Sequence, residues 1–226
     1  MVGMVTGATA TVLFPMFSKI VYDKSGLDQL TNLWQSSLRK SVILIYPMVI
    51  FFLFFSKEVM TIIYSEAYSV SAKYFTVAMV LNFFNVIIFA PLLFSMGETR
   101  FYARLHYVLA LCSWTFGYLV VVIFKAPLAI AILSVFISVI KILIALRHSS
   151  KILEVRFHQL FPIGRMLKIA LHSLISILSV VLVLRNFAPQ LSDLFLLLLA
   201  ALGYGVILWT TSKWFRIDYR VLIAPI

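Results

Sequence analysis

Seven long apolar runs limit the folds open to this chain more than any other feature. Of its 226 residues, the runs cover roughly 2–18, 40–56, 74–96, 105–124, 126–146, 169–187 and 193–212. A helix crosses a bilayer with about 20 apolar residues, whereas a barrel strand needs only about 9–11 alternating ones. Because these runs are long and continuously apolar, the sequence predicts an all-α, polytopic membrane helix bundle of about seven transmembrane helices.

Composition excludes the main soluble classes. Hydrophobic residues make up 63% of the chain and charged residues 12%. A soluble domain has about 45–50% apolar and about 25% charged residues, and a soluble fold could not cover this much apolar surface. The single Cys112 also excludes a disulfide framework. In such a chain the net charge of +11 indicates membrane topology rather than nucleic-acid binding.

Basic residues alternate from one connection to the next. Fourteen of the 19 Lys and Arg lie in segments 19–40, 97–104, 147–168 and 213–220, and only four lie in the alternate connections. The positive-inside rule assigns the basic segments to the cytoplasm. The N-terminus is therefore expected on the outer side of the cell membrane and the C-terminus in the cytoplasm. An outside start without a preceding loop predicts that the chain is the C-terminal part of a longer transporter.

Two connecting segments have two interpretations each. Residues 25–38 predict an amphipathic cytoplasmic helix, because Ser25 and Asp28 have the spacing of a capping box and Leu30 and Trp34 share a face. This helix either couples the spans or rests on headgroups as a linker. The basic loop 147–168 alternates with apolar residues, so it either binds anionic lipid or only enforces the topology.

Motifs of catalytic chemistry are missing from the sequence. It contains no G-x-x-x-x-G-K-[ST] loop, no H-E-x-x-H, no C-x-x-C and no paired carboxylates at catalytic spacing in a span. The four His residues are scattered. We therefore do not expect an ATPase, a zinc enzyme or a redox protein. The sequence predicts no cofactor, no metal ion and no catalytic residue.

Lys141 is the clearest ionisable residue inside a predicted span. One face of this predicted helix carries a stripe formed by Lys141 together with Ser134, Ser138 and His148, because their spacings match the helical period. A buried charge in a membrane faces a wet cavity or a partner. The stripe therefore either lines a path for a phosphate or carboxylate, or Lys141 extends to the cytoplasmic headgroups.

Three further polar residues in the spans are candidates. His172 lies on a stripe with Lys168 and Ser176, and it either carries a proton or hydrogen-bonds a neighbouring helix. Asn82 and Asn85 share one face of the third span. They either line a cavity or hold helices together by hydrogen bonds.

The first part of the chain carries a diffuse but familiar pattern over about residues 5–105. Residues 11–18 contain Pro15 and end in Ser18, and a charged amphipathic segment and a span with Pro47 follow. Residues 58–64 and the short turn 97–100 complete the pattern. It resembles the polysaccharide flippases, of the O-antigen or teichoic-acid type, of the multidrug/oligosaccharidyl-lipid/polysaccharide exporter superfamily.

This resemblance implies two six-helix bundles around a cavity, with the present chain forming the C-terminal half of a fourteen-helix flippase. Residues 1–146 would complete most of the second bundle, 147–168 the basic cytoplasmic loop, and 169–226 two extra helices and a cytoplasmic tail. The expected partners are a polyprenyl-phosphate-linked oligosaccharide, membrane lipids and the missing N-terminal helices, with no nucleic acid. Lys141, Ser138, Arg39, Asn82 and Asn85 are the candidate substrate contacts, and His172 the candidate proton carrier.

Three alternatives stay open at this point. A multidrug exporter of the same superfamily usually needs acidic residues within its spans, and this chain has only Asp193 at an edge. A membrane-embedded polysaccharide enzyme is expected to show a large external loop or a clustered polar site. A seven-helix receptor fits the span number and orientation, but the chain lacks a receptor motif. The resemblance therefore implies a bacterial inner-membrane flippase that is not an enzyme.

Overall fold

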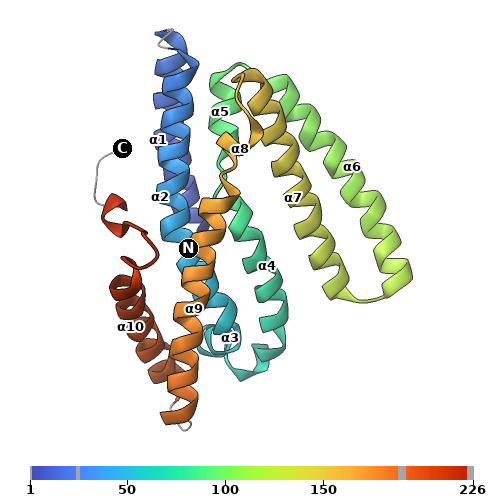
Figure 1. Ribbon diagram of the computed structural model, residues 1–226. Coiled ribbons are helices and arrows are strands. Elements are labelled where there is room, and N and C mark those ends of the chain that lie inside the picture. Colours follow the sequence, from blue (N-terminus) through green and yellow to red (C-terminus); the bar gives the residue numbers. More distant parts are fainter. Residues whose placement is uncertain (1, 24–25, 188–191, 223–226) are drawn as a thin grey trace. The chain divides into compact units, whose positions relative to one another are not determined.

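The computed structural model of the chain describes residues 2–23, 26–187 and 192–222, and the described part is helical without a strand (Figure 1). The elements in chain order are α1 (Val2–Tyr22), α2 (Leu27–Phe54), α3 (Ser56–Tyr64), η1 (Glu66–Ser71), α4 (Ala72–Asn85), α5 (Phe89–Ser95), α6 (Thr99–Phe124), α7 (Pro127–Ile152), α8 (Phe157–Leu160), α9 (Ile163–Phe187), α10 (Asp193–Thr211) and η2 (Tyr219–Leu222). Within the described residues, seven helical segments are long and apolar enough to cross a membrane. The predicted all-α membrane bundle is thereby confirmed.

The expected amphipathic helix over 25–38 is not a separate element. Residues 27–54 form the single helix α2, because neither Gly nor Pro interrupts the chain before Pro47. Leu30, Trp34 and Leu38 are buried, so this apolar face packs within the protein rather than on headgroups. The predicted cap residue Ser25 lies outside the described residues.

The third predicted span, 74–96, is broken rather than continuous. Helix α4 ends at Asn85 and α5 begins at Phe89. Pro91 explains the break, because it has no N–H to donate to the carbonyl four residues earlier. When the helix restarts at Phe89, Pro91 falls in the first turn, where no such donor is needed.

The basic segment 147–168 is more helical than a loop. Helix α7 continues to Ile152, the short α8 follows, and α9 begins at Ile163. The apolar run ends at the charged residues Arg147 and Lys151. The helix does not end there, because arginine and lysine both have high helix propensity. The apolar run therefore stops at Leu146, while the helix continues to Ile152.

The chain divides into two compact units that alternate along the sequence. The first, the α6–α7 unit, is built from residues 1–41 and 84–162, and the second, the α9–α10 unit, from residues 42–83 and 163–225. The division predicted from the sequence, into 1–146, 147–168 and 169–226, concerns functional segments rather than packing units. That division stays a prediction.

In the α6–α7 unit, α6 packs along α7 and α1 packs on α5 (Figure 1). The two helices of the α6–α7 hairpin are joined by Lys125 in the left-handed conformation (φ 49°), and Pro127 opens α7. Proline suits the first turn of a helix because its missing N–H would have no partner there. Tyr107, Leu111 and Trp114 are exposed on α6, as expected for a face that contacts lipid.

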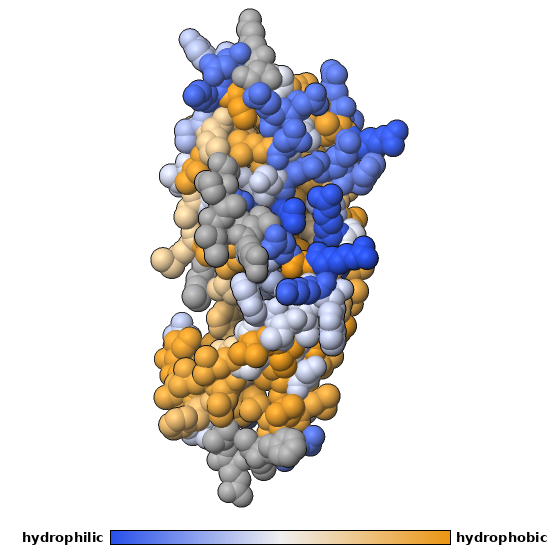
Figure 2. Space-filling model, turned by 60° about the vertical axis from the view of Figure 1, so that its left-hand side comes forward, coloured by the Kyte–Doolittle hydropathy of each residue, from blue (hydrophilic) through white to orange (hydrophobic). Residues whose placement is uncertain are grey.

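The α9–α10 unit has its own apolar core. It contains Ile50, Phe55, Ile177, Val180, Ala200, Tyr204 and Leu208. The Tyr204 hydroxyl donates to the Pro47 carbonyl at 3.2 Å, and the Tyr46 hydroxyl donates to the Phe83 carbonyl at 2.9 Å. These bonds satisfy phenols that would be costly to bury alone. The outer side of α10 forms a wide hydrophobic surface in the lower part of Figure 2.

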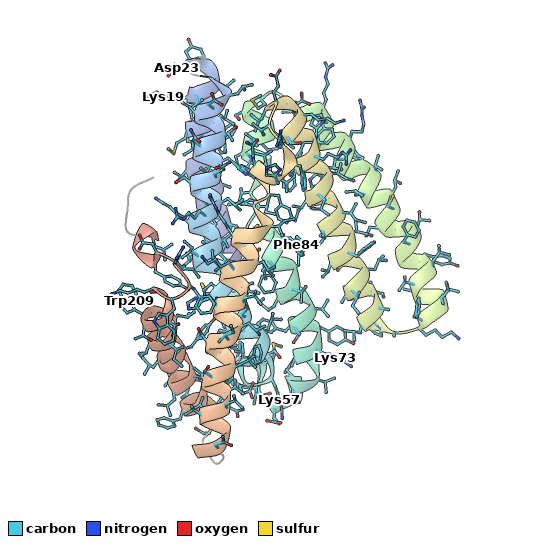
Figure 3. All side chains as sticks on the ribbon, in the orientation of Figure 1. Lys19, Asp23, Lys57, Lys73, Phe84 and Trp209 are labelled. Atoms are coloured by element: carbon cyan, nitrogen blue, oxygen red, sulfur yellow. The ribbon has the colours of Figure 1, made fainter. Side chains whose placement is uncertain are left out.

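One end of the α9–α10 unit carries two of the four basic residues expected on the outer side. Lys57 on α3 and Lys73 on α4 lie at the same end of this unit (Figure 3). Between them, α3 and η1 are packed against each other. Residues 57–70 therefore form a compact helical turn rather than an open loop.

Candidate functional site

The predicted substrate stripe on α7 is present, but its serines are already engaged. The Ser134 hydroxyl donates to the Ala131 carbonyl at 2.7 Å, and the Ser138 hydroxyl donates to the Ser134 carbonyl at 2.8 Å. Lys141 is half-buried one turn further on and lies near His106 of α6. It makes no salt bridge with a carboxylate of the described residues. Lys141 is thus the one member of this trio with free charge-assisted donors for an anion.

His148, at the end of the same stripe, is held by the start of α6. Its Nε2 lies 3.0 Å from Oε2 of Glu98, and its ring stacks on Phe101 with centroids 3.6 Å apart. Glu98 is placed by the turn before it, where Gly97 has a φ of +78°. Both partners of the pair are about a third exposed (29% and 35%). The pair joins α6 to α7 at the edge of the stripe and leaves His148 less free to contact a substrate.

The other predicted substrate contacts are spread over both units. Arg39 is exposed on α2, and Asn85 is the exposed last residue of α4; both belong to the α6–α7 unit with Lys141. Asn82 belongs to the α9–α10 unit, where its Nδ2 donates to the Ala78 carbonyl at 3.4 Å. None of these residues lines either of the two cavities described below. Their roles in substrate binding stay predictions.

His172 on α9 is fully buried and both of its ring nitrogens have partners. Nε2 lies 2.8 Å from Oγ1 of Thr211, and Nδ1 lies 3.1 Å from the Tyr219 hydroxyl. Because the Thr211 hydroxyl donates to the Ile207 carbonyl at 2.6 Å, its oxygen accepts from His172 Nε2–H. The Tyr219 hydroxyl then donates to Nδ1, a pattern that fits a neutral imidazole.

Tyr219 is suited to this donor role. Burial raises its pKa to about 12, so the phenol keeps its proton at neutral pH. The His172 ring also packs against Phe215, with centroids 4.5 Å apart. The structure therefore gives His172 the hydrogen-bonding role that the sequence left open, and it ties α9 to the segment after α10. Proton coupling by His172 stays a prediction.

Two open cavities lie at basic ends of helices. One, of about 540 Å³, is lined by Leu143, Arg147, Ser150, Lys151 and Phe157 of the α6–α7 unit. The other, of about 650 Å³, is lined by residues of the α9–α10 unit that include Lys213, Arg216, Asp218 and Tyr219. The basic segments are visible in the sequence but the cavities are not, because apolar residues that line each cavity lie a helical turn or a loop away from its basic residues.

Three partners of the histidines were also missed in the sequence: Glu98, Thr211 and Tyr219. They lie 50, 39 and 47 residues from the histidine that each contacts. Helical periodicity links only residues a few positions apart, so no local pattern could have paired them. Within the described residues, no group of three His, Cys, Asp or Glu could hold a metal ion.

Comparison with known proteins bears on the first third of the chain. The family described as polysaccharide biosynthesis protein matches residues 1–73, which cover α1, α2, α3 and η1. This match supports membership of the chain in that family. Neither a curated protein nor a solved structure matches the chain. Together with the seven candidate spans among the described residues, the match indicates a multi-pass membrane protein with a role in polysaccharide biosynthesis.

Proposed function

We propose that the chain moves a lipid-linked oligosaccharide across the plasma membrane of a bacterium during surface-polysaccharide assembly. The observation that carries this proposal is the family match over residues 1–73, together with the seven candidate spans among the described residues. A flippase shields the hydrophilic headgroup in a protein cavity while the lipid tail stays in the bilayer. It is a transporter rather than an enzyme, and its C-terminus lies in the cytoplasm.

Discontinuous and proline-containing helices support a transport cycle. The third span is interrupted at residues 86–88, and α2 contains Pro47 within its length. Both features weaken the backbone ladder at a defined point, and transporters change state by motion at such points. We infer that the break between α4 and α5 is one hinge of the alternating-access cycle.

Lys141 is the residue we assign to the phosphate of the lipid carrier. It lies within α7, it is half-buried, and no carboxylate of the described residues neutralises it. In a low-dielectric site a cation of this kind attracts a phosphate more strongly than it would in water. Ser138 can contribute only after its hydroxyl leaves the Ser134 carbonyl.

A gene deletion in the native host tests the transport role. We expect surface polysaccharide to be lost and the lipid-linked oligosaccharide to accumulate in the inner leaflet, where a glycosidase added to intact spheroplasts cannot reach it. Normal exposure of the oligosaccharide on the outer leaflet would contradict the proposal. Short surface glycans without accumulation would instead indicate a polysaccharide enzyme.

A charge variant tests the role of Lys141 in cells carrying the deletion. The gene with Lys141→Ala should restore export at least tenfold less well than wild type, the effect of losing roughly 1.4 kcal/mol of phosphate attraction. Lys125→Ala is the matched control, because Lys125 is an exposed cation in the turn at the other end of α7. Equal export by both variants would remove Lys141 from the site.

A further inference from the structure

The cavity at the basic end of α7 has the chemical character of a headgroup site. Leu143, Arg147, Ser150 and Lys151 line it from α7, and Phe157 lines it from α8. Arg147 and Lys151 are one helical turn apart, so their side chains reach the same side. Leu143 lies one turn deeper, within the apolar run. Cations therefore stand at the mouth of the cavity, and an apolar residue faces the hydrocarbon side.

The two cations have no acidic partner in the described part of the chain. The described residues contain one salt bridge, between His148 and Glu98, and it uses neither Arg147 nor Lys151. The second basic cavity differs, because Asp218 is among the residues that line it. A carboxylate in the lining lowers the positive potential that an anion meets. Of the two cavities, the one on α7 is the better site for an anion.

The wall of this cavity is held in place by long-range bonds. The Trp34 indole N–H donates to the Leu160 carbonyl at 3.0 Å, and Gln35 Nε2 donates to the Gln159 carbonyl at 3.0 Å. The side chain of Gln159 in turn accepts from the Arg156 backbone N–H at 2.9 Å. These bonds fix α8, and with it Phe157. A site held in this way loses little conformational freedom when a ligand binds.

We propose that this cavity binds the headgroup of an anionic phospholipid of the bilayer, separate from the transported glycolipid. The phosphate lies between Arg147 and Lys151, and an acyl chain runs along Leu143 and Phe157. The cavity volume of about 540 Å³ lies within the range of about 300–1,000 Å³ that is typical of ligand sites. Basic pockets at the cytoplasmic ends of membrane helices recognise such headgroups by charge. The proposal does not depend on which substrate the protein transports.

Native mass spectrometry of the whole protein in detergent, titrated with phosphatidylglycerol, tests this site. The wild-type protein should retain phosphatidylglycerol and not phosphatidylcholine. The double variant Arg147→Ala/Lys151→Ala should bind phosphatidylglycerol roughly 25-fold more weakly, about fivefold for each cation removed. The exchange Arg147→Lys/Lys151→Arg keeps both charges and should stay within about threefold of wild type.

A matched control separates the cavity from general surface charge. Arg100 and Arg104 are exposed on α6 and do not line the cavity. Arg100→Ala/Arg104→Ala should bind phosphatidylglycerol within about twofold of wild type, since long-range attraction is screened. An equal loss in this control would overturn the proposal. So would displacement of the lipid by inorganic phosphate, or preferential binding of a polyprenyl phosphate, which would assign the site to a small anion or to the transported lipid.

Discussion

Two helix ends in the α6–α7 unit have the same backbone geometry but different sequences. After α5, Gly97 N–H donates to the Phe94 carbonyl at 3.1 Å and Glu98 N–H to the Leu93 carbonyl at 2.9 Å. After α7, Glu154 N–H donates to the Lys151 carbonyl at 3.3 Å and Val155 N–H to the Ser150 carbonyl at 3.1 Å. Both are Schellman ends. The left-handed residue is glycine in the first (φ 78°) and glutamate in the second (φ 54°).

The difference shows that one end is determined locally and the other by tertiary contacts. Glycine adopts the left-handed conformation without a steric penalty, so Gly97 alone favours the turn. Glu154 carries the penalty, and burial of Leu153 and Leu160 after α7 offsets it. The indole of Trp34 bonds to this segment from a position 126 residues away. The second end should therefore depend on distant residues and the first should not.

The largest expected effect comes from removing the distant bond to the α7–α9 connection. Trp34→Phe leaves the buried Leu160 carbonyl without its donor, which should lower the free energy of unfolding by about 1–3 kcal/mol. Thermal unfolding in detergent measures the loss. The control is Trp114→Phe, because Trp114 is 82% exposed, and it should leave the melting temperature unchanged. Equal stability of both variants would mean that the second end is also determined locally.

Replacing the glycine of the first end should have the next largest effect. Gly97→Ala places a Cβ on a left-handed residue and should destabilise the protein by about 1–2 kcal/mol. The space around Gly97 is open, so the loss measures backbone strain alone. Gly164 lies within α9, also in open space and without a positive φ, and Gly164→Ala should be neutral or stabilising. A loss of the same size in the Gly164 variant would refute the assignment.

At the C-terminal end of α7, replacing the left-handed residue should stabilise the protein rather than destabilise it. Glu154→Gly removes the left-handed penalty and should raise the melting temperature, corresponding to about 0.5–1 kcal/mol of stability. Glu154→Ala removes the same carboxylate but keeps the penalty, so it should give no gain. If the alanine variant is stabilised as much as the glycine variant, the effect arises from charge and not from the backbone.

The smallest expected change in stability comes from the Glu98–His148 pair, which lies just after the C-terminal end of α5. Glu98→Gln removes the charge facing His148, but the pair is about a third exposed and solvent screens it, so we expect at most about 0.5 kcal/mol. The difference from wild type should shrink at high salt. Glu66→Gln, an exposed residue of η1, is the control and should have no effect at either salt concentration. A large, salt-independent loss would show that Glu98 is a structural anchor.

The sequence predicted the membrane bundle and the positions of the spans, because hydropathy depends on local composition. The strongly basic ends of the helices were also predicted from local composition, by counting Lys and Arg. The end of α7 was predicted six residues too early, since the apolar run stops at Leu146 and the helix continues to Ile152. Hydropathy locates the edge of the hydrocarbon, whereas the helix ends where its backbone bonds end.

The candidate sites were predicted less completely than the fold. Lys141 stands out as a charge within an apolar run, and a single residue of this kind is visible in any sequence. The partners of His172 are Thr211 and Tyr219, far away along the chain. The lipid cavity needs Phe157, which only the fold of α8 brings next to Arg147 and Lys151. Such contacts follow from tertiary packing and not from spacing.

The orientation of the spans is the claim on which both the transport and the lipid proposals depend, and single-cysteine labelling tests it directly. In a Cys112→Ser background, one variant carries His158→Cys in the basic segment and another carries Val70→Cys in η1; both positions are exposed. We predict that a membrane-impermeant maleimide labels Val70→Cys in intact spheroplasts and His158→Cys only after permeabilisation. Labelling of His158→Cys in intact spheroplasts, with Val70→Cys protected, would contradict the account.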